Sequence, residues 1–322
     1  MRRDVYLELL DWKKSRTRKP LILKGVRQVG KTYILKEFGK NEYGNVAYFN
    51  FEGDPNRADF FMGRIQPAKL IEQLSIYSEV PIRPRDTLII LDDIQNAPRA
   101  LTALKYFCED AAEYHVAAAG SLLGLKLGHA SPFLVGKVNF LDLYPLTFGE
   151  YLDAVGRSKL REFLDNRHTF DPIENIFHEE ALELLKMYFY IGGMPEVVNL
   201  YINDKDLQKV RQAQNDILFA YLQDFSKYST KTEALRITDT WNAIPPQLAK
   251  KNKKFKYSEI SKYARSRDYY ESIQWLIDAG LVYGEKYKPP VLSRAAQMNF
   301  KQDGYVRNYP LYAVSFFPGK HN

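Results

Sequence analysis

The stretch KGVRQVGKTYILKEFG (residues 24–39) decides the fold class of this chain. Within it, Gly25–Thr32 matches the pattern G-x-x-x-x-G-K-[ST], in which a glycine-rich loop joins a strand to a helix. The apolar run PLILKG (20–25) precedes the loop, and TYILKEFG (32–39) follows with a helical pattern. Both neighbours that the pattern requires are present, so we predict a phosphate-binding loop (P-loop).

This loop suits a nucleoside triphosphate. Glycine lets the backbone wrap around phosphates, and the free amides at a helix start favour negative charge. Lys31 is expected to contact the β- and γ-phosphates, and the hydroxyl of Thr32 is expected to bind Mg²⁺. The residues predicted to bind ATP are Gly25, Val26, Arg27, Gln28, Val29, Gly30, Lys31 and Thr32.

A P-loop also needs an acidic partner at the end of a neighbouring strand, and TLIILDD (87–93) supplies one. Asp92 is predicted to hold the Mg²⁺ side of the site. Asp93 is predicted to orient or deprotonate the attacking water. An alternative remains open, in which Asp93 only caps a helix that follows near residues 94–107.

Five short apolar runs alternate with helical patterns in the first 150 residues, which predicts an α/β core with a mainly parallel sheet covered on both faces. The fourth run ends in Ser121, for which we expect a role as a sensor of the γ-phosphate, with a simple turn as the alternative. The runs are PLILKG (20–25), NVAYFNF (45–51), TLIILDD (87–93), YHVAAAGS (114–121) and KVNFLDLYPL (137–146).

Charge and composition exclude several classes of protein. The net charge of +7 permits a nucleic-acid partner without requiring one. One cysteine excludes an internal disulfide framework, and five scattered histidines give no zinc spacing. No run approaches the roughly 18 apolar residues of a membrane helix, and the N-terminal segment has no apolar signal core, which predicts a cytoplasmic protein.

Beyond residue 146 the pattern changes. TFGE (147–150) is predicted to be a capping box, helices are expected to about residue 245, and Gly192, Gly193 and Pro195 are predicted to end one of them. The two prolines in IPPQLAKKNKK are expected to mark a boundary, followed by a winged-helix order. The predicted domains are 1–150 (P-loop core), 151–245 (helical lid), 246–290 (winged helix) and 291–322 (divergent or truncated tail).

The motifs LILKGVRQVGKTYILKEFG, TLIILDDIQNAPRALTALKYF, AAAGSLLG, LDLYPLTFGEYL and YIGGMPEVV occur in this order. Their succession resembles the bacterial and archaeal AAA-type ATPases that pair a P-loop core with a winged helix and a C-terminal domain of unknown function. The resemblance implies an ATPase in which Asp93 replaces the usual Glu and Ser121 is the sensor. It also implies that Gly193 and Pro195 lie near the nucleotide base; a helix stop is the alternative.

Members of this family commonly continue into a nuclease-like region, which the tail after Pro289 matches poorly. A naturally short form and a truncated or frameshifted gene both remain open, and the abrupt loss of the pattern favours the second. We expect no nuclease activity in this chain.

Two functions follow from the sequence. The first is a Mg²⁺-dependent ATPase that acts as a nucleotide switch and repositions the winged helix. The alternative is a nucleotide-regulated DNA-binding module with little turnover, which would use the winged helix and Lys250–Lys256. A protein partner for the winged helix also remains open.

Overall fold

The computed structural model describes residues 1–121, 136–167, 171–227, 229–248, 255–260, 265–282, 292–296, 301–303 and 306–310. The chain divides into two compact units. The major unit comprises Asp4–Tyr144 and Ile217–Gly284, and the minor unit comprises Met1–Arg3, Pro145–Asp216 and Glu285–Asn322. Within the described ranges, no helix is both long enough and apolar enough to cross a membrane.

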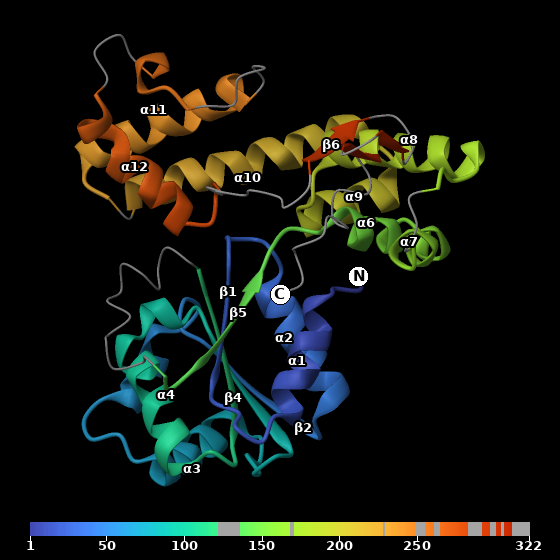
Figure 1. The fold of residues 1–322 in the computed structure, drawn as a ribbon. Helices are drawn as coiled ribbons and strands as arrows, with labels where there is room; N and C mark the ends of the chain where they lie inside the picture. Colours follow the sequence, from blue (N-terminus) through green and yellow to red (C-terminus); the bar gives the residue numbers. More distant parts are fainter. Residues whose placement is uncertain are drawn as a thin grey trace. The chain divides into compact units, whose positions relative to one another are not determined.

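A five-stranded parallel sheet forms the centre of the major unit (Figure 1). All five strands predicted from the apolar runs are present, and every neighbouring pair is parallel. The sheet order is β2-β3-β4-β1-β5. The strands are β1 (Leu21–Gly25), β2 (Asn45–Asn50), β3 (Thr87–Asp92), β4 (His115–Ser121) and β5 (Asn139–Leu143).

Helices cover both faces of this sheet. Figure 1 shows α1 (Val5–Lys14) and α2 (Lys31–Glu42) on one side, with α3 (Pro67–Ser78) and α4 (Pro98–Asp110) on the other. Alternate strand residues face opposite layers. One alternating set packs with α3, α4 and the 3₁₀ helix η1 (Pro55–Phe61) in a single buried cluster that includes Ile22, Phe49, Ile89, Leu91, Leu74 and Phe107.

The strand order places the chemistry at one edge of the sheet. Parallel strands have their carboxyl ends on the same edge, and ligands bind where the order of connections reverses. Here β1 lies between β4 and β5, and Gly25 pairs in register with Ser121 on one side and Leu143 on the other. The end of β3 at Asp92 lies at the same edge, so the P-loop and the acidic pair face a common region.

His115 begins β4 and is 4% exposed. Its Nδ1 lies 2.7 Å from the hydroxyl of Tyr43, and its Nε2 has no hydrogen-bond partner in the described part of the chain. Burial is the main cause that lowers the pKa of His115 to about 4, and the positive charges of Arg18, Lys13 and Arg85 lower it further. The imidazole is therefore neutral in the folded protein.

Because the pKa of His115 is lowered by folding, we expect the free energy of unfolding to fall in mild acid. Its pKa falls from 6.5 when the chain is unfolded to about 4 in the fold, so between these values the unfolded state binds more protons, and stability drops as pH falls. Between about pH 7.5 and about pH 5 we expect a loss of about 2 kcal/mol in urea unfolding from this group. His115→Gln should remove that share of the slope; an unchanged slope would contradict the prediction.

The minor unit contains helices and a small sheet. The predicted capping box is confirmed: Thr147 Oγ1 accepts from the amide of Glu150 at 3.2 Å, and Glu150 Oε2 accepts from the amide of Thr147 at 2.9 Å. Glu150 Oε1 also pairs with the buried Arg3 at 3.1 Å. The helices are α6 (Phe148–Ala154), α7 (Ser158–Asp165), α8 (Asn175–Ile191) and α9 (Pro195–Asp204); the strands β6 (Leu292–Ala296), β7 (Lys301–Asp303) and β8 (Val306–Pro310) pair in the order β6-β8-β7.

Helix α10 (Leu207–Lys227) has its first ten residues in the minor unit and the rest in the major unit, where α11 (Lys231–Leu248), the 3₁₀ helix η4 (Tyr257–Glu259) and α12 (Ser266–Asp278) follow. The helices expected to about residue 245 continue to Leu248, because α11 runs through Pro245 and Pro246. The side chain of Gln247 explains the extra turn, since it bonds both the amide and the carbonyl of Lys256, at 2.7 and 3.2 Å.

The winged helix stays a prediction. Helix α12 lies where the second helix was expected, and the first is represented by the short η4. Residues 249–254 and 283–291, which hold most of the lysine run and the expected wing, lie outside the described residues. The domain limits at 150, 245 and 290 likewise remain predictions.

Candidate functional site

The P-loop follows β1 directly and depends on glycine at two positions. A Cβ on Gly25 would lie 2.4 Å from the carbonyl oxygen of Leu143, so no side chain fits there. Gly30 has a φ of 97°, a left-handed conformation that costs glycine little, and it immediately precedes α2. Val26 and Val29 are buried and anchor the loop to the core.

Lys31, the first residue of α2, folds back over the loop. Its Nζ donates to the carbonyl oxygens of Gly25 at 3.0 Å and Val26 at 2.9 Å. Burial lowers the pKa of Lys31 to about 8, and the negative charges of Asp93 and Asp92 partly oppose that shift. A desolvated cation whose hydrogen bonds within the described residues go to neutral carbonyls favours an anionic ligand, because a phosphate would compensate the lost hydration.

The structure brings Thr32 and Asp92 together as the sequence predicted. Thr32 Oγ1 donates to Asp92 Oδ2 at 2.7 Å, and the amide of Asp93 donates to Asp92 Oδ1 at 3.1 Å. A hydroxyl and a carboxylate beside a phosphate loop are hard oxygen ligands, which is the set that Mg²⁺ prefers together with nucleotide phosphates. The residues present therefore fit a magnesium ion, which Thr32 and Asp92 would hold.

Asp93 is half-buried and has a φ of 52°, in the left-handed region. Its side chain makes no capping bond; instead its Oδ1 accepts from Gln95 Nε2 at 3.1 Å. Burial, followed by the charge of Asp92, raises its pKa. The helix expected from residue 94 is a 3₁₀ turn at Ile94–Asn96, and α4 begins only at Pro98. The geometry gives the capping alternative no support, while the catalytic role remains a prediction.

Two polar residues of β2 also belong to this site, and the sequence reasoning missed both. The hydroxyl of Tyr48 donates to Asp92 Oδ2 at 2.8 Å, and Asn50 Nδ2 donates to the hydroxyl of Tyr48 at 3.3 Å. Asn50 is paired in register with Asp92 on β3. The signal that could have found them is positional, because polar residues near the end of a strand at this edge of a parallel sheet face the ligand side.

The remaining predicted residues have structural positions but no tested role. Ser121 is the backbone partner of Gly25 in the sheet. A Cβ on Gly193 would lie 2.4 Å from the carbonyl oxygen of Leu146, and Pro195 is the first residue of α9. These contacts fit the helix-stop alternative. Gly193 and Pro195 belong to the minor unit and the P-loop to the major unit, so their contact with a nucleotide base stays a prediction.

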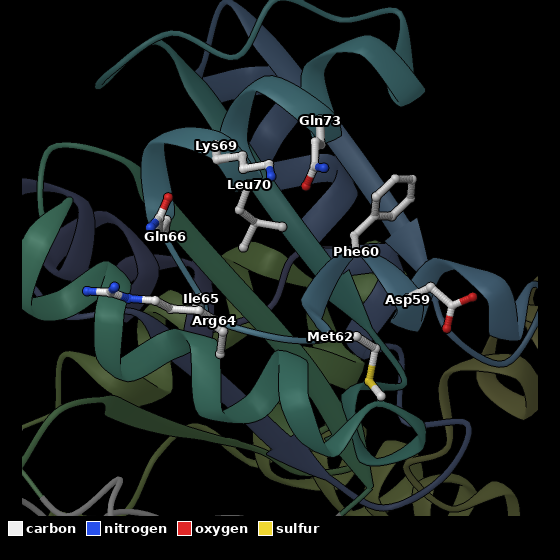
Figure 2. A pocket seen from close by; sticks show the side chains of 9 residues that line it. All are labelled: Asp59, Phe60, Met62, Arg64, Ile65, Gln66, Lys69, Leu70 and Gln73. Atoms are coloured by element: carbon white, nitrogen blue, oxygen red, sulfur yellow. The ribbon is translucent and has the colours of Figure 1, made fainter.

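A separate cavity of about 250 Å³ lies in the major unit where η1 connects to α3. Figure 2 shows polar Lys69 and Gln73 close to the apolar Leu70 on the α3 side of this cavity. Its lining contains no P-loop residue and neither Asp92 nor Asp93, so it is not part of the nucleotide site. Its lining is Asp59, Phe60, Met62, Arg64, Ile65, Gln66, Lys69, Leu70 and Gln73.

Comparisons with known proteins agree with this fold. Residues 17–152 match the family described as AAA domain, and residues 182–301 match a domain of unknown function, DUF8612. The second match continues past Pro289, where the sequence analysis expected the family pattern to stop. A search of the curated proteins found no relative.

Among solved structures, the Walker-type ATPase PABY2304 of Pyrococcus abyssi is similar, with a TM-score of 0.56 and 14% identity over 88% of this chain and 91% of that one. AMPPCP-bound DnaA from Aquifex aeolicus aligns with a TM-score of 0.36 and 16% identity, over 86% of each chain. ORC1 of Aeropyrum pernix, in complex with DNA, gives 0.35 and 14% over 86% and 81%. At these identities the likeness concerns the fold alone. Of these three structures, the ATPase of Pyrococcus abyssi is the one whose TM-score supports a shared fold.

The parallel sheet, the P-loop, the acidic residue at the end of β3 and the match to the AAA domain family support a P-loop ATPase. More narrowly, residues 17–152 match the AAA domain, and residues 182–301 match the domain of unknown function.

Proposed function

We propose that this chain is a Mg²⁺-dependent ATPase in which the occupancy of the P-loop changes how α10 is held, and with it the predicted winged-helix segment. The observation that carries the proposal is a pair of contacts between the P-loop and α10, both formed at Arg27 and both within the major unit.

The proposed chemistry is transfer of the γ-phosphoryl group to water. Lys31 binds the β- and γ-phosphates and neutralises their charge, while Thr32 and Asp92 hold the metal. Mg²⁺, when bound, supplies further neutralisation of the phosphate oxygens. Asp93 orients the attacking water and takes its proton, a role that its raised pKa supports. Ser121 reports on the γ-phosphate.

Arg27 lies within the P-loop, and two residues of α10 contact it, one at its backbone and one at its side chain. Tyr221 donates its hydroxyl to the carbonyl oxygen of Arg27 at 3.0 Å, and Arg27 Nη1 donates to Asp224 Oδ1 at 2.9 Å. A second carboxylate, Glu52, lies 4.0 Å from Arg27 Nη2. Tyr221 and Asp224 are three residues apart and share one face of the helix.

Phe225, the residue after Asp224 on α10, contacts both α11 and α12. The ring centroid of Phe225 lies 6.0 Å from that of Trp241 on α11 and 5.2 Å from that of Trp275 on α12, both edge to face. Phe225 is 1% exposed. A shift of α10 relative to α11 and α12 would therefore change the surroundings of both tryptophans.

Incoming phosphates would compete with Asp224 for Arg27. The Arg27 side chain is 46% exposed, so its ion pair with Asp224 contributes only about 0.5–1 kcal/mol. ATP brings up to four negative charges into the loop that contains Arg27, attracting the guanidinium and repelling the carboxylate. A nucleotide can drive a conformational change only through such a difference in contacts between states, and ADP carries less of this charge.

Asp224→Asn tests this coupling. The wild type should change its tryptophan emission when ATP and Mg²⁺ bind, because Trp241 and Trp275 both contact Phe225. In Asp224→Asn we expect at least half of that response to be lost, while nucleotide affinity stays within about threefold, since the lost surface pair contributes little energy. Emission and affinity are measured on the same samples.

Asp216→Asn provides the matched control, because Asp216 lies earlier on α10 and pairs with Gln212 rather than with the P-loop. It should respond like the wild type. An undiminished emission change in Asp224→Asn would contradict the proposed coupling.

The DNA-binding alternative depends on a segment of which the structure describes little. Lys256 is held through its backbone by Gln247, and residues 250–254 lie outside the described ranges. The side chain of Arg267, in the first turn of α12, is 74% exposed and leaves room for phosphate contacts. The alternative differs from the switch in requiring DNA binding that weakens with salt and needs no turnover.

A further inference from the structure

Asp92, the carboxylate predicted to face the metal, accepts hydrogen bonds from two hydroxyl groups on a single oxygen. Thr32 Oγ1 lies 2.7 Å and the Tyr48 hydroxyl 2.8 Å from Asp92 Oδ2. Asp92 is 3% exposed, and its other oxygen accepts the amide of Asp93. In a buried site every one of these bonds matters, because water cannot replace a lost donor.

The neighbours of Tyr48 fix the direction in which its proton points. Asn50 Oδ1 accepts from the amides of Glu52 and Gly53 at 2.7 and 2.8 Å, which orients the side-chain amide. Asn50 Nδ2 must then face Tyr48 and donate to its oxygen. The phenol proton is left with Asp92 as its acceptor, so Tyr48 is a donor to the carboxylate.

The ring of Tyr48 is fixed as well as its hydroxyl. The ammonium group of Lys36, on α2, lies 3.5 Å from the ring centroid, a short cation–π distance. Tyr48 is on β2, the strand next to β3, so the contact to Asp92 connects two strands of the rigid sheet. The phenol of Tyr48 is therefore carried by a sheet strand rather than by a loop.

We propose that Tyr48 is a positioning residue for the metal site: together with Thr32 it fixes Asp92 Oδ2, so that the carboxylate stays in place when a cation binds. The Thr32 hydroxyl can bind the cation through an oxygen lone pair while its proton still points to Asp92 Oδ2. That hydroxyl is then shared between the cation and the carboxylate, whereas the Tyr48 proton is directed to Asp92 alone. The inference rests on the proposed magnesium-dependent function.

Tyr48→Phe removes this hydroxyl and keeps the ring. Loss of a partner that orients a metal ligand typically costs 10–100-fold in metal affinity, so we expect the Mg²⁺ concentration for half-maximal tightening of ATP binding to rise about tenfold. A fluorescent ATP analogue measures this without any turnover. ATP affinity in excess chelator should stay within about twofold of the wild type, because Tyr48 does not line the phosphate loop.

Tyr33→Phe is the matched control, since Tyr33 lies on α2 and is 58% exposed. It should behave as the wild type. Lys36→Gln gives a second route that keeps the hydroxyl but frees the ring, with an expected rise of about threefold in the Mg²⁺ requirement. It replaces Tyr48→Phe as the deciding variant if thermal melting shows that Tyr48→Phe does not fold.

The outcomes separate the two proposals. A wild-type Mg²⁺ requirement in the folded Tyr48→Phe protein, or in Lys36→Gln where that variant decides, would overturn the positioning role and leave the ATPase standing. A wild type that binds ATP equally well with and without Mg²⁺ would overturn the magnesium site itself and the inference with it.

Discussion

Replacing Lys31 by alanine is expected to weaken ATP binding about 100-fold, because two charge-assisted contacts to phosphate oxygens, together about 3 kcal/mol, are lost. The ammonium of Lys31 donates to the carbonyls of Gly25 and Val26, and burial lowers its pKa to about 8. The charges of Asp93 and Asp92 offset this desolvation only in part, and a bound phosphate would compensate more of it. Phosphate release should fall at least as far as binding.

Lys40→Ala is the control for this experiment, because Lys40 is an exposed lysine near the other end of α2. Its ATP affinity should match the wild type. Thermal melting without nucleotide should show Lys31→Ala at least as stable as the wild type, since a partly desolvated charge has been removed. If Lys31→Ala kept full turnover, the assignment of the P-loop as the catalytic site would be wrong.

The second large effect is expected for Asp93→Asn. The asparagine keeps the size of the side chain and the oxygen that Gln95 bonds, but it cannot accept the proton of the attacking water. Turnover should fall by about 10²–10⁴-fold, the usual contribution of a general base. Affinity for ATP with Mg²⁺ should stay within about threefold, because the metal carboxylate Asp92 is untouched.

Asparagine is also the substitution that the backbone tolerates. Asp93 has a φ of 52°, and after glycine, Asn and Asp are among the residues that adopt this left-handed conformation most often. A control on the neighbouring residue, Gln95→Ala, should reduce turnover much less; equal losses in the two variants would point to local structure rather than to proton transfer.

Much of the core was predictable because its signals are local. The apolar runs around Ile22, Phe49 and Ile89 gave the five strands, and the loop pattern with Asp92 gave the nucleotide site. The capping box at Thr147 and Glu150 is equally local and is confirmed. In each case the pattern that carries the prediction is short and lies within a single stretch of the sequence.

What the sequence did not reveal depends on contacts between distant residues. The bond from Arg27 to Asp224 joins positions 197 residues apart, and that from Tyr48 to Asp92 joins positions 44 apart. No sequence motif marks Asp224 as a partner of Arg27 or Tyr48 as a partner of Asp92. The continuation of α11 through Pro245 has the same origin, since a tertiary contact at Gln247 overrides the local preference of proline.

Hydrogen exchange of residues 217–227 measures whether nucleotide changes the contacts between α10 and the P-loop, because this part of α10 carries Tyr221 and Asp224. Asp93→Asn protein would be saturated with ADP and Mg²⁺ or with ATP and Mg²⁺, so that the triphosphate persists. We expect faster amide exchange in this segment with ATP than with ADP, because ATP releases the contacts of Tyr221 and Asp224 with Arg27. Identical exchange in the two states would contradict a switch that runs from the P-loop through α10.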